Sequence, residues 1–476
     1  MTRRTKIVAT IGPASETREV MGALVDAGMD VARFSLSHAS LDDTLAKIAR
    51  LREVAADRER HIGVLADLPG PKIRAAEVEG DGVLLAEGGT VELVTAANGE
   101  RSTGSRIAVE DAPVHVLEAG DRVALGDGAI QLVVETAGER AVTRVATGGW
   151  IQGRPGVLLP PSRSMLSAPT PEDLRLLEGL VDAGVDAVAV SFVRSAADID
   201  AARAVRPDAF LVAKIETAEA VEDLASIVAT ADGVMVARGD LGLRCAIEDV
   251  PHHQKRIIRT GVAFARPVIT ATQMLESMIR SPVPTRAEVS DIANAVFDGS
   301  SALMLSGETA IGHDPALAVA TMARIALRAE RDFDHEGWGQ RVERLQTSSP
   351  EVPVAARVTG AVSAAAWRAA IEADLDAIIA CTNTGATARA ISRFRPRIPV
   401  IAATPSEVTA RVLSMAWGIT PIVTDRHGTT DDVVWFAVQA AVDAGLVRKD
   451  ALVGVLVGSP IEPGPITDTL RLVRVS

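Results

Sequence analysis

The sequence of 476 residues is poor in cysteine and contains no long uninterrupted apolar segment. Its two cysteines, Cys245 and Cys381, have neither zinc-site spacing nor a disulfide pattern, which is typical of proteins from a reducing compartment. No apolar run is long enough to span a membrane, and the chain does not begin with a secretory signal. We therefore expect a soluble protein of the cytoplasm.

Positive charge is also in deficit, because 49 lysine and arginine residues stand against 62 aspartate and glutamate residues. The resulting formal net charge of -13 argues against nonspecific binding to nucleic acid or to anionic membranes. An anionic substrate would need a local basic cluster to attract it. The P-loop pattern GxxxxGK[ST] and the glycine loop of protein kinases are missing too, which disfavours the familiar nucleotide-binding folds.

Short apolar segments, most of them followed by a stretch with helical periodicity, form the main pattern of the chain. There are eight: TKIVATIG, MDVARFSLSH, HIGVLADLPG, DAVAVSFV, FLVAKIET, DGVMVARGD, RPVITATQM and SALMLSGET. Alternating strands and helices favour a parallel sheet, and eight repeats are the number that closes a (β/α)₈ TIM barrel. We predict an α/β protein whose catalytic barrel comprises residues 1–74 and 164–345.

Two further regions interrupt or follow the barrel pattern. Residues 75–163 contain short β-like runs between glycine turns, including an Asp127-Gly128 hairpin signal, and predict an inserted all-β lid domain, a small β-barrel over the barrel mouth. Residues 346–476 resume the alternation and predict a C-terminal open α/β domain. In that domain the segment CTNTGATA is either a phosphate cradle or an ordinary turn of small residues.

Charged and hydroxyl side chains gather at the C-terminal ends of the predicted barrel strands, the face on which such barrels assemble active sites. They are Arg33, Asp67, Lys214, Glu216, Asp240, Thr272 and Glu308. Lys214 and Glu216 are two residues apart on one strand, so they share a face. Glu216 with Asp240 could hold Mg²⁺, and Lys214 beside the metal would suit phosphoryl transfer. The alternative is a Lys214–Glu216 ion pair without a catalytic role.

The segments TKIVATIGPAS, DLPGPKIR, VAKIET, MVARGDLG, ITATQMLESM and LMLSGETA resemble the motifs of the pyruvate kinase family, in the family's order and over nearly the whole chain. The resemblance implies the last step of glycolysis, in which the phosphoryl group of phosphoenolpyruvate passes to ADP and the enolate is protonated to pyruvate. It also implies Mg²⁺ or Mn²⁺ as cofactor, a homotetramer and an allosteric C-terminal domain. The alternatives are a non-catalytic metabolite-binding paralogue and a metal-dependent, enolate-forming barrel lyase.

The same resemblance assigns roles to individual residues. Glu216 and Asp240 are the implied metal ligands. The implied catalytic residues are Lys214, Arg33, Thr272, Ser306 and Glu308. Of these, Lys214 would neutralise the phosphoryl group, and Ser306 and Glu308 would supply the proton. Substrate contacts are expected from Arg33, Lys214, Gly239, Asp240 and Thr272. Nucleotide contacts are expected from Pro13, His38 and Arg74, and effector contacts from Thr382, Asn383, Thr384, Gly385, Ala386 and Thr387.

Departures from the family pattern concern the monovalent cation that many members hold near the substrate phosphate. The corresponding residues here are Ser35, Ser37, Asp67 and Lys72. Ser35 replaces a common asparagine, and Lys72 replaces a glutamate. Because a fixed ammonium can supply the positive charge that K⁺ otherwise brings, we predict catalysis without potassium.

Other departures concern the nucleotide and the effector. Pro155 occupies the place of a nucleotide-contacting lysine, with Arg154 beside it, which puts the nucleotide affinity in doubt. The effector loop has no basic residue at Ala386, and Glu462 stands where an arginine would meet a second phosphate. We therefore expect a sugar monophosphate or AMP to activate better than a bisphosphate.

Overall fold

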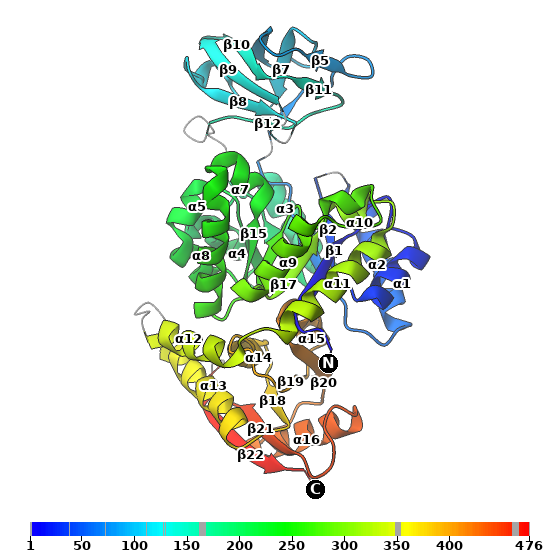
Figure 1. Ribbon diagram of the computed structural model, residues 1–476, viewed down its shortest axis with the longest axis vertical. Helices are drawn as coiled ribbons and strands as arrows, with labels where there is room; N and C mark the ends of the chain where they lie inside the picture. The colour runs from blue at the N-terminus through cyan, green and yellow to red at the C-terminus, as the bar shows by residue number, and fades with distance from the viewer. Residues whose placement is uncertain are drawn as a thin grey trace.

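The computed structural model describes residues 2–475 except residues 38, 72, 111, 127, 129, 161–167, 348–353 and 459–465. Figure 1 shows three bodies stacked along the long axis of the molecule. A β-rich body lies at one end, a barrel ringed by helices lies in the middle, and an α/β body carries the C-terminus at the other end. None of the described helices is both long and apolar enough to cross a lipid bilayer.

Parallel strands form the central barrel, which confirms the fold predicted from the apolar segments. Over the described residues it closes from eight strands, each matching one predicted segment: β1 (Lys6–Thr10), β2 (Val31–Ser35), β3 (Gly63–Asp67), β13 (Ala187–Val190), β14 (Leu211–Ile215), β15 (Gly233–Ala237), β16 (Val268–Ala271) and β17 (Ala302–Leu305). Most of their residues are buried, as expected of strands enclosed by helices on one side and barrel side chains on the other.

Helices surround this barrel and are fixed by local signals in the sequence. They are α1 (Arg18–Ala27), α2 (Leu41–Ala56), α3 (Pro171–Asp182), α4 (Ala196–Val205), α5 (Ala218–Glu222), α6 (Leu224–Thr230), α7 (Arg238–Arg244), α8 (Val250–Ala263), α9 (Arg286–Asp298), α10 (Gly307–Ala310) and α11 (Pro315–Arg331). A capping box joins Thr285 and Glu288 at the start of α9, whose end is closed by Gly299 in the left-handed conformation.

In its described residues the inserted body is all β apart from one short 3-10 turn at Val114–Val116, and it has its own apolar core. Its larger sheet has the order β12-β8-β9-β10-β6-β7-β4, and a second sheet pairs β11 with β5. The strands are β4 (Arg74–Ala75), β5 (Val83–Leu85), β6 (Thr90–Thr95), β7 (Arg106–Glu110), β8 (Arg122–Leu125), β9 (Ile130–Thr136), β10 (Arg140–Thr147), β11 (Gly149–Ile151) and β12 (Val157–Leu158). The chain enters this body after β3 and returns to the barrel at α3, so the body extends from one barrel loop.

The C-terminal body is an open sheet in the order β20-β19-β18-β21-β22. Its elements are α12 (His335–Thr347), α13 (Val354–Glu372), β18 (Ala377–Cys381), α14 (Ala386–Ser392), β19 (Val400–Thr404), α15 (Glu407–Val412), β20 (Ile419–Val423), α16 (Thr430–Asp443), β21 (Leu452–Val457) and β22 (Thr469–Arg474). This sheet confirms the open α/β domain predicted from the sequence, and β22 adds an antiparallel edge. The strand order reverses between β18 and β21, where open α/β sheets bind ligands.

Candidate active site

Lys214 stands at the centre of a buried polar cluster at the C-terminal ends of the barrel strands. Its Nζ donates to Ser191 Oγ over 2.7 Å and lies 3.2 Å from Asp67 Oδ1 and 3.5 Å from Glu216 Oε2. Burial disfavours the ammonium, but the carboxylates of Asp67, Glu216 and Asp240 outweigh it and raise the pKa of Lys214 above its ordinary value. Lys214 therefore keeps its positive charge although its side chain is largely buried.

Asp67, the last residue of β3, joins Lys214 to Arg33. The Nε and Nη2 atoms of Arg33 lie 2.8 and 2.6 Å from Asp67 Oδ2, and Arg33 Nη1 donates to Thr10 Oγ1 over 3.1 Å. Burial opposes the charge of Asp67, but Lys214 and Arg33 hold the pKa of this carboxyl below its usual range. The paired carboxylate thus fixes two cations side by side at one mouth.

Glu216 is fully buried beside Lys214, as the spacing of the two residues predicts. Its Oε1 accepts a hydrogen bond from the Phe192 amide over 2.5 Å, whereas its Oε2 is buried and accepts none among the described residues. Burial raises the pKa of Glu216 to about 7, and the neighbouring charge of Asp240 acts in the same direction. The Oε2 atom accepts no hydrogen bond among the described residues, although the Lys214 ammonium lies 3.5 Å away, and a buried carboxylate oxygen of this kind is suited to binding a cation.

Asp240 lies in the first turn of α7, directly after β15, and faces the lid domain. It lines a pocket between the two bodies that is partly open to solvent, together with Phe192 and Leu243 of the barrel and Gly128 and Leu158 of the lid. This contact agrees with the predicted lid position over the barrel mouth. The Arg244 guanidinium, also at the pocket, lies 5.1 Å from the centre of the Phe192 ring.

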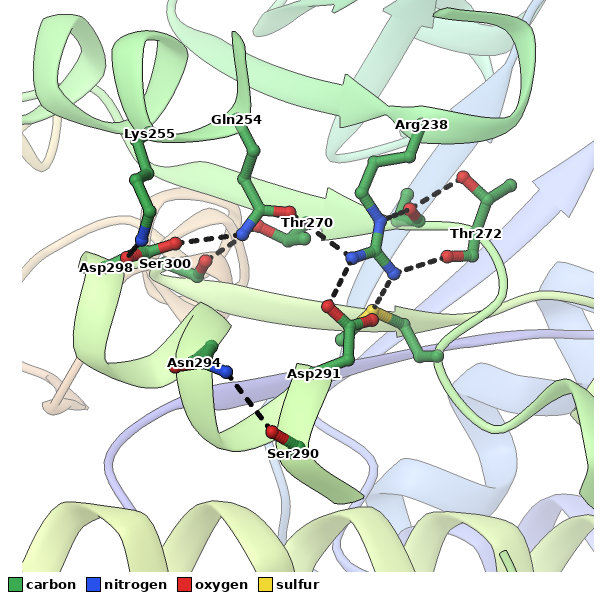
Figure 2. Close-up of polar contacts among 12 residues, drawn as sticks. Arg238, Gln254, Lys255, Thr270, Thr272, Ser290, Asp291, Asn294, Asp298 and Ser300 are labelled. Atoms are coloured by element: carbon green, nitrogen blue, oxygen red, sulfur yellow. Dashed lines mark hydrogen bonds and ion pairs between the residues drawn. The ribbon is translucent and has the colours of Figure 1, made fainter. Parts of the chain in front are cut away.

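Thr272 follows β16 with a backbone in the left-handed region, at φ +68°, and Gln273 has φ +54°. Arg238 holds this turn: its Nε donates to the Ala271 carbonyl over 3.1 Å and its Nη2 to the Thr272 carbonyl over 2.6 Å. The hydroxyl of Thr272 accepts a hydrogen bond from the Gly239 amide over 2.9 Å. The first turn of α7 therefore positions the threonine hydroxyl through both main-chain and side-chain contacts (Figure 2).

Outside this turn, Arg238 is held by a polar network that reaches α8 and α9 (Figure 2). Its Nη1 lies 2.7 Å from Asp291 Oδ1 and 3.3 Å from Gln254 Oε1. The amide nitrogen of Gln254 in turn donates to Asp298 over 3.0 Å, and Lys255 pairs with the same carboxylate. Two barrel helices thus fix the guanidinium on which the Thr272 turn depends.

Glu308 is completely buried in α10 and closes the opposite side of this turn. Its Oε1 accepts a hydrogen bond from the Leu275 amide over 3.0 Å, and its Oε2 accepts one from the Ser306 amide over 2.7 Å. The Glu308 carboxylate therefore ties the end of β17 to the loop that follows Thr272. The proton-supply role of Ser306 and Glu308 remains a prediction.

Other predicted site residues lie further out or are not described. Arg74 is in the lid strand β4, where its Nη1 donates to the Arg154 carbonyl over 3.2 Å, so the described contacts do not join it to Lys214. Pro13 is exposed in the turn after β1, Ser35 ends β2 opposite Asp67, and Ser37 lies in the turn beyond the strand. His38 and Lys72 lie outside the described residues, as does Glu462.

The predicted effector loop connects β18 to α14 at the reversal point of the C-terminal sheet. Gly385 has φ +81°, which favours glycine, and its amide donates to Thr382 Oγ1 over 2.9 Å. Thr387 Oγ1 lies 2.6 Å from Thr467 Oγ1, in the segment that follows β21. The threonines therefore face the edge at which this sheet type binds ligands, while Asn383, Thr384 and Ala386 complete the turn.

Ser191 and Thr10 belong to the cluster, although the sequence did not single them out. Ser191 follows β13 and accepts a hydrogen bond from Lys214, while its own hydroxyl lies 2.7 Å from the Leu68 carbonyl. Thr10 ends β1 and receives Arg33. Their position in the sequence could have identified them as site residues, because each carries a hydroxyl at the end of an apolar barrel segment.

The two predicted metal ligands fit a hard divalent cation. The buried Glu216 Oε2 lacks a hydrogen-bond donor among the described residues, and Asp240 acts electrostatically on both Glu216 and Lys214. Within the described ranges, no group of three or more His, Cys, Asp or Glu side chains could surround an ion. Mg²⁺ commonly takes one or two carboxylates and fills its remaining positions with water and substrate oxygens. Glu216 and Asp240 match that donor set.

Comparison with known proteins gives one consistent family. The pyruvate kinase barrel-domain model matches residues 2–319, and the pyruvate kinase alpha/beta-domain model matches residues 360–473. A pyruvate kinase of Methylorubrum extorquens is 41% identical over 477 residues, which cover all of this chain and 98% of that protein. One from Bacillus licheniformis is 38% identical over 99% of this chain and 80% of its own length, and one from Thermococcus litoralis is 36% identical over 99% and 98%.

Proposed function

The chain belongs to the pyruvate kinase family, and from that premise we propose that it transfers the phosphoryl group of phosphoenolpyruvate to ADP at the Lys214 cluster. The P–O bond to the enol oxygen breaks, a new bond forms to a terminal oxygen of ADP, and the enolate takes up a proton to become pyruvate. The observation that carries this proposal is the buried Lys214 ammonium, held by Asp67, Ser191 and Glu216.

Each residue of the cluster has a task that its contacts support. Lys214 and Arg33 neutralise the phosphoryl oxygens in transit, since preorganised charges in a dry site stabilise charge without reorganisation. The Asp240 amide, at the start of α7, receives the substrate carboxylate, whereas the Gly239 amide, expected to contact it as well, donates to Thr272 Oγ1. Thr272, fixed by Arg238 and by the Gly239 amide, positions the proton for the enolate methylene. Ser306 and Glu308 complete the proton supply, with Glu308 also holding the backbone of the turn.

We further propose that Glu216 and Asp240 hold Mg²⁺ or Mn²⁺ and that K⁺ is not required. A bound divalent cation would polarise the substrate oxygens and offset their charge. Asp67 is already engaged by two cations, because Lys214 meets Oδ1 and Arg33 meets Oδ2. Its carboxylate therefore has little charge left to attract a monovalent ion. Pro13, His38 and Arg74 are proposed contacts for the nucleotide.

Regulation and assembly are proposed on the C-terminal body. The loop of residues 382–387 would bind the phosphate of a sugar monophosphate or of AMP, which its position at the strand-order reversal supports. A homotetramer in the cytoplasm is proposed by family membership, and the exposed Trp435 and Phe436 of α16 suit a subunit contact. Titration of AMP, ribose 5-phosphate and fructose 1,6-bisphosphate against the phosphoenolpyruvate saturation curve tests the effector, and stronger activation by the bisphosphate contradicts it.

A coupled assay tests the proposed reaction. Phosphoenolpyruvate, ADP and Mg²⁺ are supplied to the full chain, and pyruvate and ATP are measured separately, with ADP omitted in the control. Equal amounts of pyruvate and ATP, formed only with ADP, are expected. No turnover of either product would favour a metabolite-binding paralogue, and pyruvate formed from other substrates without ATP would favour a lyase.

A further inference from the structure

Four arginine side chains line one cavity at the seam between the base of the barrel and the C-terminal body. Arg266 lies just before β16, whereas Arg389, Arg393 and Arg395 lie on α14 and directly after it. The cavity is partly open to solvent, and Ser301, Ser392 and Trp417 are among its other walls. None of its described lining residues is acidic, in a protein whose net charge is -13. This cavity is therefore a local concentration of positive charge in a protein that is negatively charged as a whole.

Main-chain carbonyls hold these guanidinium groups in place without neutralising them. Arg266 donates to the carbonyls of Val228 and Ala229 near the end of α6, over 3.3 and 2.9 Å. Arg395 donates to the carbonyls of Val296 and Ser300 around the end of α9, over 3.3 and 2.6 Å. Carbonyls at a helix end carry only partial negative charge, so a positive excess remains at the cavity.

The carboxylates that act on these arginines are bound by other groups. In the described part of the chain, Arg266, Arg389 and Arg395 form no ion pair with an acidic side chain. Asp232, which acts on Arg266 and Arg389 from a distance, is bound by Arg203 at 2.6 Å. Glu330, which acts on Arg395, accepts hydrogen bonds from main-chain amides at the start of the chain.

The electrostatic state of the arginines agrees with this geometry. Burial lowers the pKa of Arg389 to about 10 and that of Arg395 to about 9, and it also lowers the pKa of Arg266. Arg389 and Arg395 still carry their charge at neutral pH. A buried charge is costly unless a partner of opposite sign is present.

We propose that this cavity binds a small oxyanion of the phosphate class, either inorganic phosphate or the phosphate of a monoester, between Arg266 of the barrel and Arg389 of α14. Planar guanidinium groups match the oxygens of phosphate and form charge-assisted hydrogen bonds with them. The anion would link the start of β16 to α14, the helix that follows the predicted effector loop. The other end of β16 leads to Thr272. The site is separate from the proposed catalytic cluster, and its occupation does not depend on turnover.

Calorimetric titration with inorganic phosphate tests the site, at constant ionic strength and with chloride as the competing anion. Loss of one charge-assisted contact should weaken phosphate binding at least about tenfold in Arg266→Gln and in Arg389→Gln. Arg175→Gln is the matched control, because Arg175 is exposed on α3 and pairs only locally with Glu172. It should bind phosphate as the parent does.

Two further variants separate this cavity from other phosphate sites. The pair Thr382→Val and Thr387→Val removes the hydroxyls of the effector loop, and Lys214→Met removes the central cation of the catalytic cluster. Binding that persists in these variants and is weakened in the two arginine variants supports the proposal. Binding lost only in the loop variant or only in Lys214→Met overturns it, as does a parent protein that binds no phosphate; the arginines would then serve only the helix-end carbonyls.

Because the arginine variants could disturb the seam itself, the unaltered protein provides an independent test. Crystals soaked in tungstate, an anomalously scattering phosphate analogue, should show a peak between Arg266 and Arg389. Peaks confined to other places would overturn the proposal. Once the site is located, the dissociation constants for inorganic phosphate and for ribose 5-phosphate are compared. The ligand with the lower dissociation constant identifies whether the site prefers free phosphate or a phosphate monoester.

Discussion

The Arg238 guanidinium donates to the Thr272 carbonyl over 2.6 Å, so a residue at the start of α7 fixes a left-handed turn at the end of β16. A non-glycine residue in this backbone region is uncommon and persists where surrounding contacts determine it. Arg238 supplies two such contacts, to the Ala271 and Thr272 carbonyls, and Asp291 holds its guanidinium in place. The hydroxyl of Thr272 therefore owes its position to a side chain that need not touch substrate.

Arg238→Lys should lower kcat by about ten- to a hundredfold with little change in the KM for phosphoenolpyruvate, because an ammonium cannot reproduce the fork of contacts and the threonine hydroxyl would shift. Steady-state kinetics with the coupled assay measures the split. Arg175→Lys, an exposed substitution of the same kind, should leave both constants unchanged. Equal kinetics for Arg238→Lys and the parent would show that Arg238 does not position Thr272.

Glu216→Gln should raise the Mg²⁺ concentration needed for half-maximal activity, because it removes the charge of the buried oxygen that lacks a donor and keeps the size of the side chain. The side-chain carbonyl of the introduced glutamine can still accept a hydrogen bond from the Phe192 amide, so the fold should survive. Metal titrations at saturating substrate measure the effect. Glu222→Gln, an exposed residue on α5, is the control. An unchanged metal requirement in Glu216→Gln would remove it from the metal site.

Potassium should activate the enzyme less than tenfold. Initial rates in tetramethylammonium and potassium buffers of equal ionic strength measure this, because Asp67 is already paired with Lys214 and Arg33. Activation of tenfold or more by K⁺ rejects the prediction. Lys72→Glu should lower activity in both buffers, because it removes the ammonium that is proposed to replace K⁺. Added K⁺ should restore only part of the activity, because the side chain of Ser35 is shorter than that of asparagine and leaves the ion site incomplete.

His335 should make the protein less stable in acid. Its Nδ1 lies 2.8 Å from the Arg395 carbonyl, its Nε2 is buried without a hydrogen-bond partner among the described residues, and the charged groups that face it are Arg4, Arg395 and Arg397. Burial lowers the pKa of His335, and these arginines add to the shift. The unfolded chain, in which histidine has a pKa of about 6.5, therefore takes up the proton first.

The contribution of neutral His335 to the free energy of unfolding is consequently complete above about pH 6.5. It decreases as the pH falls toward the lower pKa that His335 has in the folded state. Urea unfolding at pH 7.5 and pH 5.5 measures the free energy of unfolding. The parent should lose more of it than His335→Gln, whose amide can still donate to the Arg395 carbonyl. An equal loss in both proteins would contradict the prediction.

The sequence predicted the barrel and the main residues of its site because both depend on local patterns. Apolar segments mark the strands, and Lys214 and Glu216 share a face through their spacing alone. The partners of these residues depend on contacts distant in sequence. In the sequence, Ser191 is an ordinary polar residue at the end of a strand, and its contact with Lys214 follows only from the pairing of β13 with β14. The Arg238 guanidinium likewise binds carbonyls more than thirty residues away.

The C-terminal body shows the same limit. Three strands, β18, β19 and β21, follow from buried apolar runs. In contrast, β22 is an exposed edge whose residues have no continuous apolar face, so only its pairing with β21 identifies it. The arginine cavity at the seam likewise combines Arg266 with α14, which lies more than a hundred residues later. Spacing in the sequence carries no information about such a pair.

The most direct test of the account is the turnover of Lys214→Met in the coupled assay, measured beside binding of phosphoenolpyruvate by calorimetry. If Lys214 neutralises the phosphoryl group mainly in the transition state, kcat should fall by about a thousandfold while phosphoenolpyruvate binding is largely retained. Lys449→Met, an exposed lysine beyond α16, should behave as the parent. A kcat for Lys214→Met within tenfold of the parent would contradict the central role of the Lys214 cluster.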